Sequence, residues 1–261
     1  QPDDWLYLLD STGFEDAVTL MDELDPGLHH YLLAARRPPR QAVEPQKTLE
    51  PQASCLLVAG GTGLSLELAR QMQSDLERDG IQATLVAAPG AMAAGEAVPA
   101  DFLAPGELDR FTGRLRSHEA QPLKVVYLAG LDEACAGEDA LAELGSRVSN
   151  GNMRLVNFLK AVTQTDKPDK PSIWIVTSGA VAAAPGPIHA GMAGLWGIGR
   201  VARNEYPDLD CRLVDLQPGA TPKQLSRWLC QELSAADGEE EVVLTEVGRS
   251  ALRLAAAAAG Q

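Results

Sequence analysis

Short apolar runs alternate with longer segments of helical period along most of this sequence, and that alternation restricts its fold more than any other feature. The run Cys55–Ala59 is continuously apolar, as expected for a parallel strand that helices cover on both faces. Beyond a glycine turn, apolar residues recur every fourth position, the spacing of one helix face, at Leu64, Leu68, Met72 and Leu76. Gly80 follows that stripe, and glycine commonly follows the last turn of a helix.

The same alternation continues to residue 245. Further strands are predicted at 81–87, 123–129, 172–177, 211–216 and 241–245. Further helices are predicted at 108–115, 141–162, 190–205 and 225–233, with a bend where Asn150-Gly151-Asn152 lies inside the second of them. Strands joined through helices of this length imply right-handed crossovers. We therefore predict an α/β fold, a Rossmann-like doubly wound parallel sheet.

Charge and hydropathy exclude several classes of protein. The formal net charge is −14, and no cluster of basic residues exceeds the pair Arg36-Arg37, which disfavours nucleic-acid binding. No apolar run approaches the ~20 residues that span a bilayer. The start, Gln1-Pro2-Asp3-Asp4, is acidic, unlike a signal peptide, and lacks an initiator methionine. We expect a cytoplasmic protein cut from a longer chain, with neither nucleic acid nor membrane as partner.

The spacing of cysteine and histidine argues against a metal site. The four cysteines, Cys55, Cys135, Cys211 and Cys230, form no C-x-x-C pair, and no histidine joins them at ligand spacing. The pair His29-His30 lacks a third ligand. We therefore expect no bound metal. Because Cys55, Cys211 and Cys230 lie in apolar runs, we expect them to be buried free thiols.

Residues 38–53 divide the chain, because they contain four prolines and few large apolar residues. That composition is typical of a linker. It separates a short N-terminal segment, residues 1–37, from a main body at 54–254. Residues 255–261 form an alanine-rich tail, which we expect to be frayed.

The stretch Ala59-Gly60-Gly61-Thr62-Gly63 lies between a strand and a helix, which is the place of a phosphate-binding turn. Short-chain reductases carry a further glycine three residues after such a turn, where cofactor and helix meet, but Leu66 stands there. The next strand ends in Thr84–Pro89, with neither an acidic residue for the ribose nor an Arg for a 2′-phosphate. We therefore expect no bound cofactor and interpret four residues as a degenerate turn: Gly60, Gly61, Gly63 and Leu66.

The catalytic pattern of short-chain reductases is incomplete as well. These enzymes place a Ser at the end of a central strand, a Tyr about a dozen residues later and a Lys four residues after the Tyr, whose phenol pKa it lowers. Ser178 stands at such a strand end, but Ala190 and Gly191 occupy the expected place of the Tyr. No Lys occurs between Lys170 and Lys223. We therefore expect no catalytic residues in this chain.

Two further polar residues are given structural interpretations. Asp215 ends a buried strand, at the sheet edge where functional carboxylates gather in such folds. We predict instead that it caps or hydrogen-bonds the following loop. His189 directly precedes a helix, where a capping or surface position is predicted rather than that of a catalytic base.

The block from Gly194 to Asp208 (GLWGIGRVARNEYPD), followed by Cys211–Leu216, closely resembles the structural subdomain of polyketide synthase ketoreductases. The resemblance extends over residues 54–254, through CLLVAGGTG and LKVVYLAGLDEA. It implies a truncated fold of the short-chain dehydrogenase/reductase type that binds no cofactor and packs against a catalytic half. The implied partners are that half and neighbouring domains of a multidomain, acyltransferase-class megasynthase, such as a methyltransferase, an enoylreductase and an acyl carrier protein.

Within this block, the indole of Trp196 and the small residues Gly197 and Gly199 suit a helix packed closely on a neighbour. Arg200 is expected to bond to a nearby carboxylate, for which Asp215 is the suggested partner. We interpret these five residues as structural or interface residues.

The first forty residues resemble a different family. Trp5, Leu8-Leu9, Gly13-Phe14-Glu15-Asp16 and Tyr31–Arg37 resemble the last helix and strands of a class I methyltransferase. Such C-methyltransferase domains often precede a ketoreductase in these synthases, and their S-adenosylmethionine loop would lie upstream. The alternative is that residues 29–37 form the first strand of the ketoreductase half itself.

Two other functions stay open at this point. A divergent NADP-dependent ketoreductase would need a proton donor from outside the usual pattern. A C-methyltransferase fragment would need the glycine-rich loop that these residues lack. The favoured hypothesis is a pseudo-ketoreductase, a non-catalytic subdomain that supports a catalytic ketoreductase half in polyketide chain biosynthesis.

Overall fold

The chain divides into two compact units, Gln1–Gln46 and Lys47–Gln261, and each is described by itself. The structure is a computed structural model. It describes Tyr7 and residues 15–21, 31–36, 54–61, 63–91, 98–102, 104, 110–113, 115, 123–133, 140–164, 170–183, 185–235 and 237–253.

The smaller unit contains one antiparallel pair of strands, β1 (Glu15–Met21) and β2 (Tyr31–Arg36). Met21 lies opposite Tyr31 in their register. In the described residues of this unit, β2 pairs with β1. The assignment of residues 1–37 to a methyltransferase tail, or to a strand of the ketoreductase half, stays a prediction.

An eight-stranded sheet in the order β10-β9-β8-β7-β6-β3-β4-β5 forms the frame of the larger unit. Its strands are β3 (Ser54–Val58), β4 (Gln82–Ala87), β5 (Val98–Pro99), β6 (Leu123–Tyr127), β7 (Ser172–Ser178), β8 (Cys211–Leu216), β9 (Glu241–Thr245) and β10 (Gly248–Ala251). All neighbouring pairs are parallel except β9 and β10. The chain winds outward from β3 in both directions, so the predicted doubly wound parallel sheet is confirmed.

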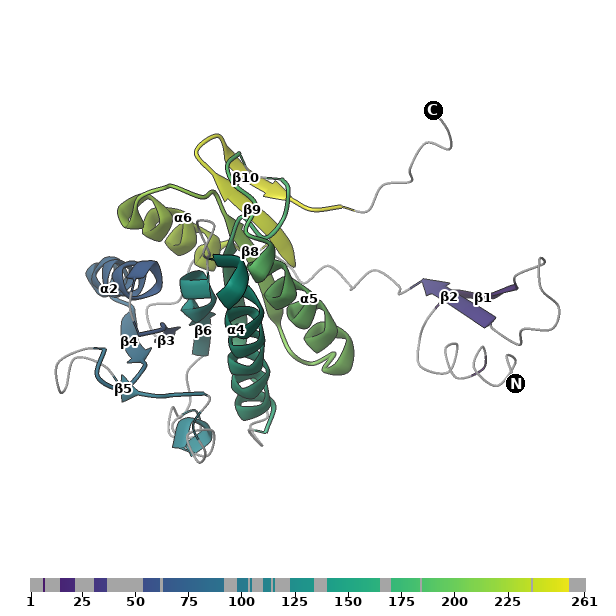
Figure 1. The fold of residues 1–261 in the computed structure, drawn as a ribbon, viewed down its shortest axis with the longest axis horizontal. Coiled ribbons are helices and arrows are strands. Elements are labelled where there is room, and N and C mark those ends of the chain that lie inside the picture. Colours follow the sequence, from purple (N-terminus) through teal and green to yellow (C-terminus); the bar gives the residue numbers. More distant parts are fainter. Residues whose placement is uncertain are drawn as a thin grey trace. The chain divides into compact units, whose positions relative to one another are not determined.

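Helices cover both faces of this sheet, as Figure 1 shows. They are α2 (Gly63–Arg78), α4 (Ala140–Thr163), α5 (Ala190–Glu205) and α6 (Pro222–Ser234), with a short 3-10 helix η1 (Ala129–Glu133) after β6. Residues 110–113 and 115 are helical too. The helices α4 and α5 lie side by side on one face, and α2 packs beside α6.

Successive residues of each buried strand face opposite apolar clusters, which is the two-residue period of a strand. In β3, Leu56 belongs to the cluster of α4 and α5, whereas Leu57 belongs to the cluster of α2 and α6. The first cluster contains Phe158, whose ring centroid lies 4.9 Å from that of Tyr127. Both faces of the sheet are therefore covered by apolar side chains, which explains why the strands are continuous apolar runs in the sequence.

The predicted helices agree closely with the observed ones, and the differences have physical reasons. Helix α4 continues through Asn150-Gly151-Asn152 without interruption. The strand expected at 123–129 ends at Tyr127, because the chain turns into η1. The sequence did not predict β5, which has only two residues, or β10, whose residues are mostly exposed. No helix in the described ranges is long and apolar enough to cross a membrane.

Candidate functional site at the carboxyl edge of the sheet

The carboxyl ends of parallel strands are where doubly wound proteins hold their ligands, at the point where the winding reverses. Here that point lies between β3 and β6, which are neighbours in the sheet. The glycine turn follows β3, η1 follows β6, the loop at 179–189 follows β7, and Asp215 lies in β8. The fold therefore brings the glycine turn, Ser178, His189 and Asp215 to one edge of the sheet, together with η1, which the sequence had not singled out.

A carboxylate from η1 closes the glycine turn. Asp132 accepts hydrogen bonds from the backbone N–H of Ser65 at 3.2 Å and from the Ser65 hydroxyl at 2.8 Å. The hydroxyl oxygen of Ser65 in turn accepts from the N–H of Gly60 at 2.9 Å. Ser65 lies in the first turn of α2 and is fully buried. Negative charge at this end of a helix is favourable, because the free N–H groups and the helix dipole point toward it.

The glycines of the turn fit closely around this carboxylate. A Cβ added at Gly60 would lie 2.0 Å from Oδ2 of Asp132. Gly63 has a φ of +68°, and its Cβ would lie 3.5 Å from Oδ1 of the same side chain. The contacts with Asp132 and the backbone conformation thus account for Gly60 and Gly63 without a bound nucleotide.

Leu66 points into the protein core. It is 8% exposed and belongs to the apolar cluster of α2 and α6, together with Leu68 and Met72. At the end of β4, Ala87 is buried, and the Cβ of Ala88 would lie 3.5 Å from a Cβ at Gly61. The structure thus places apolar side chains beside the turn, and the acid that reaches it comes from a different element.

Asp215 is completely buried and holds the loop after β7. Its Oδ1 accepts from the hydroxyl of Thr177 at 2.7 Å and from the N–H of Ala180 at 2.9 Å, and its Oδ2 accepts from Val181 at 3.2 Å. Thr177 and Asp215 lie opposite each other in the register of β7 and β8. Burial raises the pKa of Asp215 above its usual value, against the lowering effect of these hydrogen bonds. Asp215 thus connects β8 with the end of β7 and with the loop that follows it.

Ser178 and His189 lie at the two ends of this loop. Ser178 is 5% exposed, and its N–H lies 3.2 Å from Sδ of Met192. Nδ1 of His189 lies 3.1 Å from the carbonyl oxygen of Ser178. His189 occupies the N-cap position of α5, but its side chain makes no capping hydrogen bond. The imidazole therefore holds the two ends of the loop together and does not cap the helix. The sequence had suggested a capping or surface position.

The larger unit contains two tyrosines, and neither exposes its phenol at the carboxyl edge of the sheet. The ring of Tyr127 is 1% exposed and packs against Phe158. Tyr206 follows the last residue of α5. It therefore lies roughly 24 Å along the axis from the first turn, at 1.5 Å per residue. A phenol near Ser178 would have to come from another chain segment.

The two glycines of the α5 block differ in their surroundings. A Cβ at Gly199 would lie 2.3 Å from Cδ2 of Leu213, so this glycine allows α5 to approach the sheet closely. Gly197 is exposed, with no atom within 4 Å of an added Cβ. Trp196 is 3% exposed in the core, and its indole N–H has no hydrogen-bond partner among the described residues.

Arg200 does not bond to Asp215, which corrects the suggested pairing. It donates two hydrogen bonds to Glu241, at 2.9 and 2.7 Å, because β9 begins beside the last turns of α5. Arg203 also contacts Glu241. Burial raises the pKa of Glu241, but the bonds to the two arginines outweigh it and hold that pKa below its usual value.

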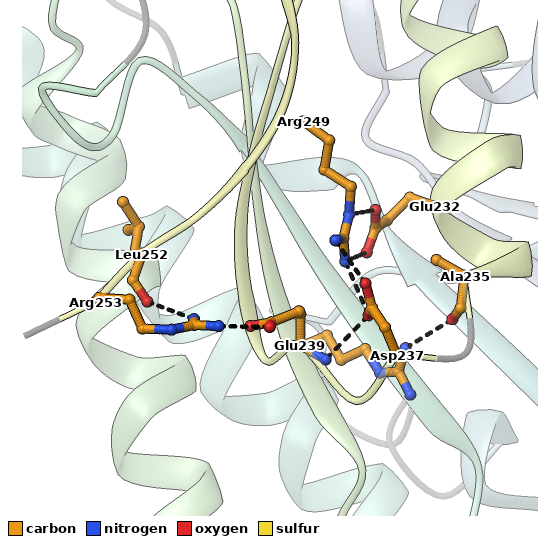
Figure 2. A network of polar contacts seen from close by, with 8 residues as sticks. Glu232, Ala235, Asp237, Glu239, Arg249, Leu252 and Arg253 are labelled. Carbon is orange, nitrogen blue, oxygen red and sulfur yellow. Dashed lines mark hydrogen bonds and ion pairs between the residues drawn. The ribbon is translucent and has the colours of Figure 1, made fainter. Parts of the chain in front are cut away.

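A second network of ion pairs fastens the C-terminal strand pair, and the sequence did not reveal it. Figure 2 shows Arg249 bonded to both oxygens of Glu232, at 2.5 and 3.0 Å, and to Asp237 at 2.7 Å. The side chain of Glu232 is 1% exposed. Arg253 bonds to Glu239. These contacts connect β10 to α6 and to the loop before β9.

Cations gather at the opposite, amino edge of the sheet. Nζ of Lys124 donates to the carbonyl of Leu233 at 2.5 Å, and Arg212 donates to the carbonyl of Ala235 at 3.4 Å. Both carbonyls lie at the C-terminal end of α6, where positive charge is favourable. Nζ of Lys124 and Cζ of Arg212 also lie 5.4 and 5.1 Å from the ring centroid of Trp174.

No cluster of three or more His, Cys, Asp or Glu residues that could hold a metal ion occurs among the described residues.

A family model described as polyketide synthase extender module SpnB, Rossmann fold domain, matches residues 81–254. The class that the fold defines is thus a Rossmann-type domain, and the chain belongs to this polyketide synthase family.

The curated relatives are long synthases. Polyketide synthase GfsA of Streptomyces halstedii is 42% identical over 89 residues, which are 33% of this chain and 1% of GfsA. Pikromycin polyketide synthase component PikAIII of Streptomyces venezuelae is 38% identical over 90 residues, which are 34% of this chain and 6% of PikAIII. The chain thus spans a small fraction of each of these relatives.

Solved structures share the fold. A C2-type ketoreductase from a modular polyketide synthase has a TM-score of 0.59 at 21% identity, over 82% of this chain and 43% of that chain. The first ketoreductase of the tylosin synthase has a TM-score of 0.55 at 24% identity, over 78% of this chain and 38% of that chain. A short-chain dehydrogenase from Burkholderia cenocepacia, solved with NADP, has a TM-score of 0.53 at 17% identity, over 76% of this chain and 90% of that chain.

Proposed function

We propose that this chain is a structural, non-catalytic subdomain of a polyketide synthase, a pseudo-ketoreductase that supports a catalytic ketoreductase half. The observation that carries the proposal is the placement of the tyrosines: Tyr127 is buried in the core and Tyr206 follows the far end of α5. Neither can give a proton to a carbonyl beside Ser178. Without a proton donor the reduction of a ketone is incomplete.

The extent of the structural similarity supports a half-molecule. The chain matches 90% of a single short-chain dehydrogenase but only 43% of a modular ketoreductase. One Rossmann-type unit is therefore present, and it matches less than half of the modular ketoreductase chain. In this proposal the missing part is the catalytic half, which this unit contacts.

The surface of α4 and α5 is the proposed contact with that half. Met153 on α4 is 50% exposed and Val201 on α5 is 57% exposed, on two helices that pack against each other. Gly197 and Ala193, one and two turns before Val201, are exposed small residues. Exposed apolar side chains beside small residues are typical of a helix that packs on another helix.

The remaining assignments complete the proposal. Residues 1–37 are the end of a C-methyltransferase domain, 38–53 a linker, 54–254 the structural subdomain and 255–261 a tail. Neighbouring synthase domains, including a methyltransferase, an acyl carrier protein and in some arrangements an enoylreductase, are the partners, in the cytoplasm. The chain binds no cofactor.

Titration of NADPH into the purified chain tests the cofactor-free, non-catalytic proposal. We expect no saturable rise in nicotinamide fluorescence and no NADPH-dependent reduction of a β-ketoacyl thioester. A saturable rise together with reduction of the thioester would overturn the proposal in favour of a divergent reductase.

Binding to a separately produced catalytic half, measured by calorimetry, tests the supporting role. Val201→Glu should weaken binding at least about tenfold, because it places a charge in the proposed apolar contact. Val247→Glu is the matched control, since Val247 is 87% exposed in the turn between β9 and β10. Equal binding by the wild type and both variants would reject α4 and α5 as the contact surface.

A further inference from the structure

The carboxylate of Asp132 lies where an anionic ligand of a glycine turn would be bound. It takes the N–H of Ser65 at 3.2 Å and the hydroxyl of Ser65 at 2.8 Å. A phosphate at the start of a helix is held in the same way, by free N–H groups and a hydroxyl of the first turn. The Asp132 side chain is thus an anion supplied by the protein itself.

The space at the turn is also taken. A Cβ at Gly60 would lie 2.0 Å from Oδ2 of Asp132 and 3.3 Å from the hydroxyl oxygen of Ser65. Those atoms fill the room beside the Gly60 backbone through which a phosphate oxygen would have to approach. Leu66, by contrast, belongs to the core cluster of α2 and α6.

We propose that Asp132 is an internal substitute for the phosphate of a nucleotide, and that it, rather than Leu66, closes this turn to phosphate-bearing ligands. The proposal deepens the cofactor-free function proposed above and rests on it. Two effects exclude an external phosphate: the donors of Ser65 are already engaged, and two anions at one helix end repel each other. Removal of the carboxylate then frees the donors and lifts the repulsion.

The test compares pyrophosphate binding by the wild-type chain and by Asp132→Ala, measured by calorimetry at low ionic strength. We expect the variant to bind pyrophosphate at least about tenfold more tightly than the wild type, in line with the effect of a charge at a helix N-terminus. NADPH in a second titration shows whether a nucleotide phosphate gains the same access as free pyrophosphate. A folded Asp132→Ala chain that binds pyrophosphate no better than the wild type overturns the proposal.

The matched control is Asp75→Ala. Asp75 also accepts a hydrogen bond from a serine of another element, the hydroxyl of Ser226 at 2.7 Å, but it lies near the C-terminal end of α2. This control should bind pyrophosphate as the wild type does. An equal gain in Asp75→Ala and Asp132→Ala would show a general effect of net charge and would also overturn the proposal.

Asp132→Asn decides the question if Asp132→Ala does not fold, since the amide keeps the volume and an acceptor for Ser65. It should bind pyrophosphate more tightly than the wild type, because the repulsion is gone, and equal affinity overturns the proposal. The wild-type titration separates the two levels of inference. Saturable NADPH binding by the wild type would refute the cofactor-free function, whereas failure in the variants alone refutes only the role of Asp132.

Discussion

Side chains of opposite charge bond to free backbone groups at the two edges of the large sheet. At the carboxyl edge, the acids Asp132 and Asp215 accept hydrogen bonds from backbone N–H groups, including one in the first turn of α2. At the amino edge, Lys124 and Arg212 donate to carbonyls at the C-terminal end of α6. At each edge, these side chains carry the charge that complements the backbone groups they contact. The N–H groups and carbonyls named here thus find their partners within the chain at both edges.

The carboxyl edge should respond most strongly to the loss of an acid. Asp215→Ala removes the acceptor of the N–H groups of Ala180 and Val181, and it leaves the hydroxyl of Thr177 with only the carbonyl of Val214, at 3.5 Å. We expect the free energy of unfolding to fall by about 3 kcal/mol or more, measured by urea denaturation. A loss below about 1 kcal/mol would mean that the loop after β7 finds other acceptors.

The pH dependence of stability gives a second measure of Asp215. Because burial raises its pKa in the folded state, the folded protein binds this proton more tightly than the unfolded chain. The stabilising contribution is present below the unfolded pKa and is lost as the pH rises through the folded pKa. We expect Asp215→Asn to remove this decline from unfolding curves measured between about pH 4 and pH 8. An unchanged pH profile would contradict the assignment.

We expect that position 60 has to be a glycine because the side chain of Asp132 lies against it. Gly60→Ala brings a Cβ against Oδ2 of Asp132, so we expect a loss of about 1–3 kcal/mol in the free energy of unfolding. In the background of Asp132→Ala the same substitution should cost at least about 1 kcal/mol less, because the clash is absent. A double-mutant cycle by thermal or urea unfolding measures this coupling, and additive effects would break the link between the two residues.

Loss of one cation at the amino edge should reduce stability less, because a second cation bonds to the same helix end. Lys124→Met removes the bond to the carbonyl of Leu233 but leaves Arg212 beside the end of α6. We therefore expect the free energy of unfolding to fall by about 1 kcal/mol.

Burial, followed by repulsion from Arg212, lowers the pKa of Lys124, so the folded protein releases this proton more readily than the unfolded chain. The stability that Lys124 contributes is therefore lost as the pH falls through its folded pKa. The free energy of unfolding, measured between about pH 7 and pH 10, should therefore rise less with pH in the variant than in the wild type.

The smallest effect is expected for Arg200→Ala. The guanidinium bonds to Glu241 through two donors, but its side chain is 53% exposed and Arg203 contacts the same carboxylate. We expect a loss of at most about 1 kcal/mol, and less at high salt, because exposed ion pairs are screened. A larger loss at the same edge would show that the two edges are more alike than the comparison holds.

Most of the fold followed from local sequence patterns. The range 190–205 of α5 and the range 211–216 of β8 were predicted to the residue, because both have clear periods and abrupt ends. The strand β10 was missed because three of its four residues are exposed and give no apolar alternation. Its position depends on pairing with β9 and on the ion pairs of Arg249, which no local pattern reveals.

The candidate site was less predictable, because its contacts join distant segments. The sequence identified the turn at Gly60–Gly63 and the unusual Leu66, but the partner of the turn is Asp132, which lies 67 positions after Ser65. Asp132 stands in the stretch LAGLDEA, but it reaches the turn only because β3 and β6 are neighbours in the sheet. Likewise, the register of β8 and β9 places Glu241, not Asp215, beside Arg200.

The contact between Ser65 and Asp132 has a mechanical consequence. It bridges the elements that follow β3 and β6, the two central strands from which the chain departs in opposite directions. Any motion that separates these two elements has to break this contact as well as the pairing of β3 with β6. The Ser65 amide should then exchange its hydrogen as slowly as amides in the middle of the sheet.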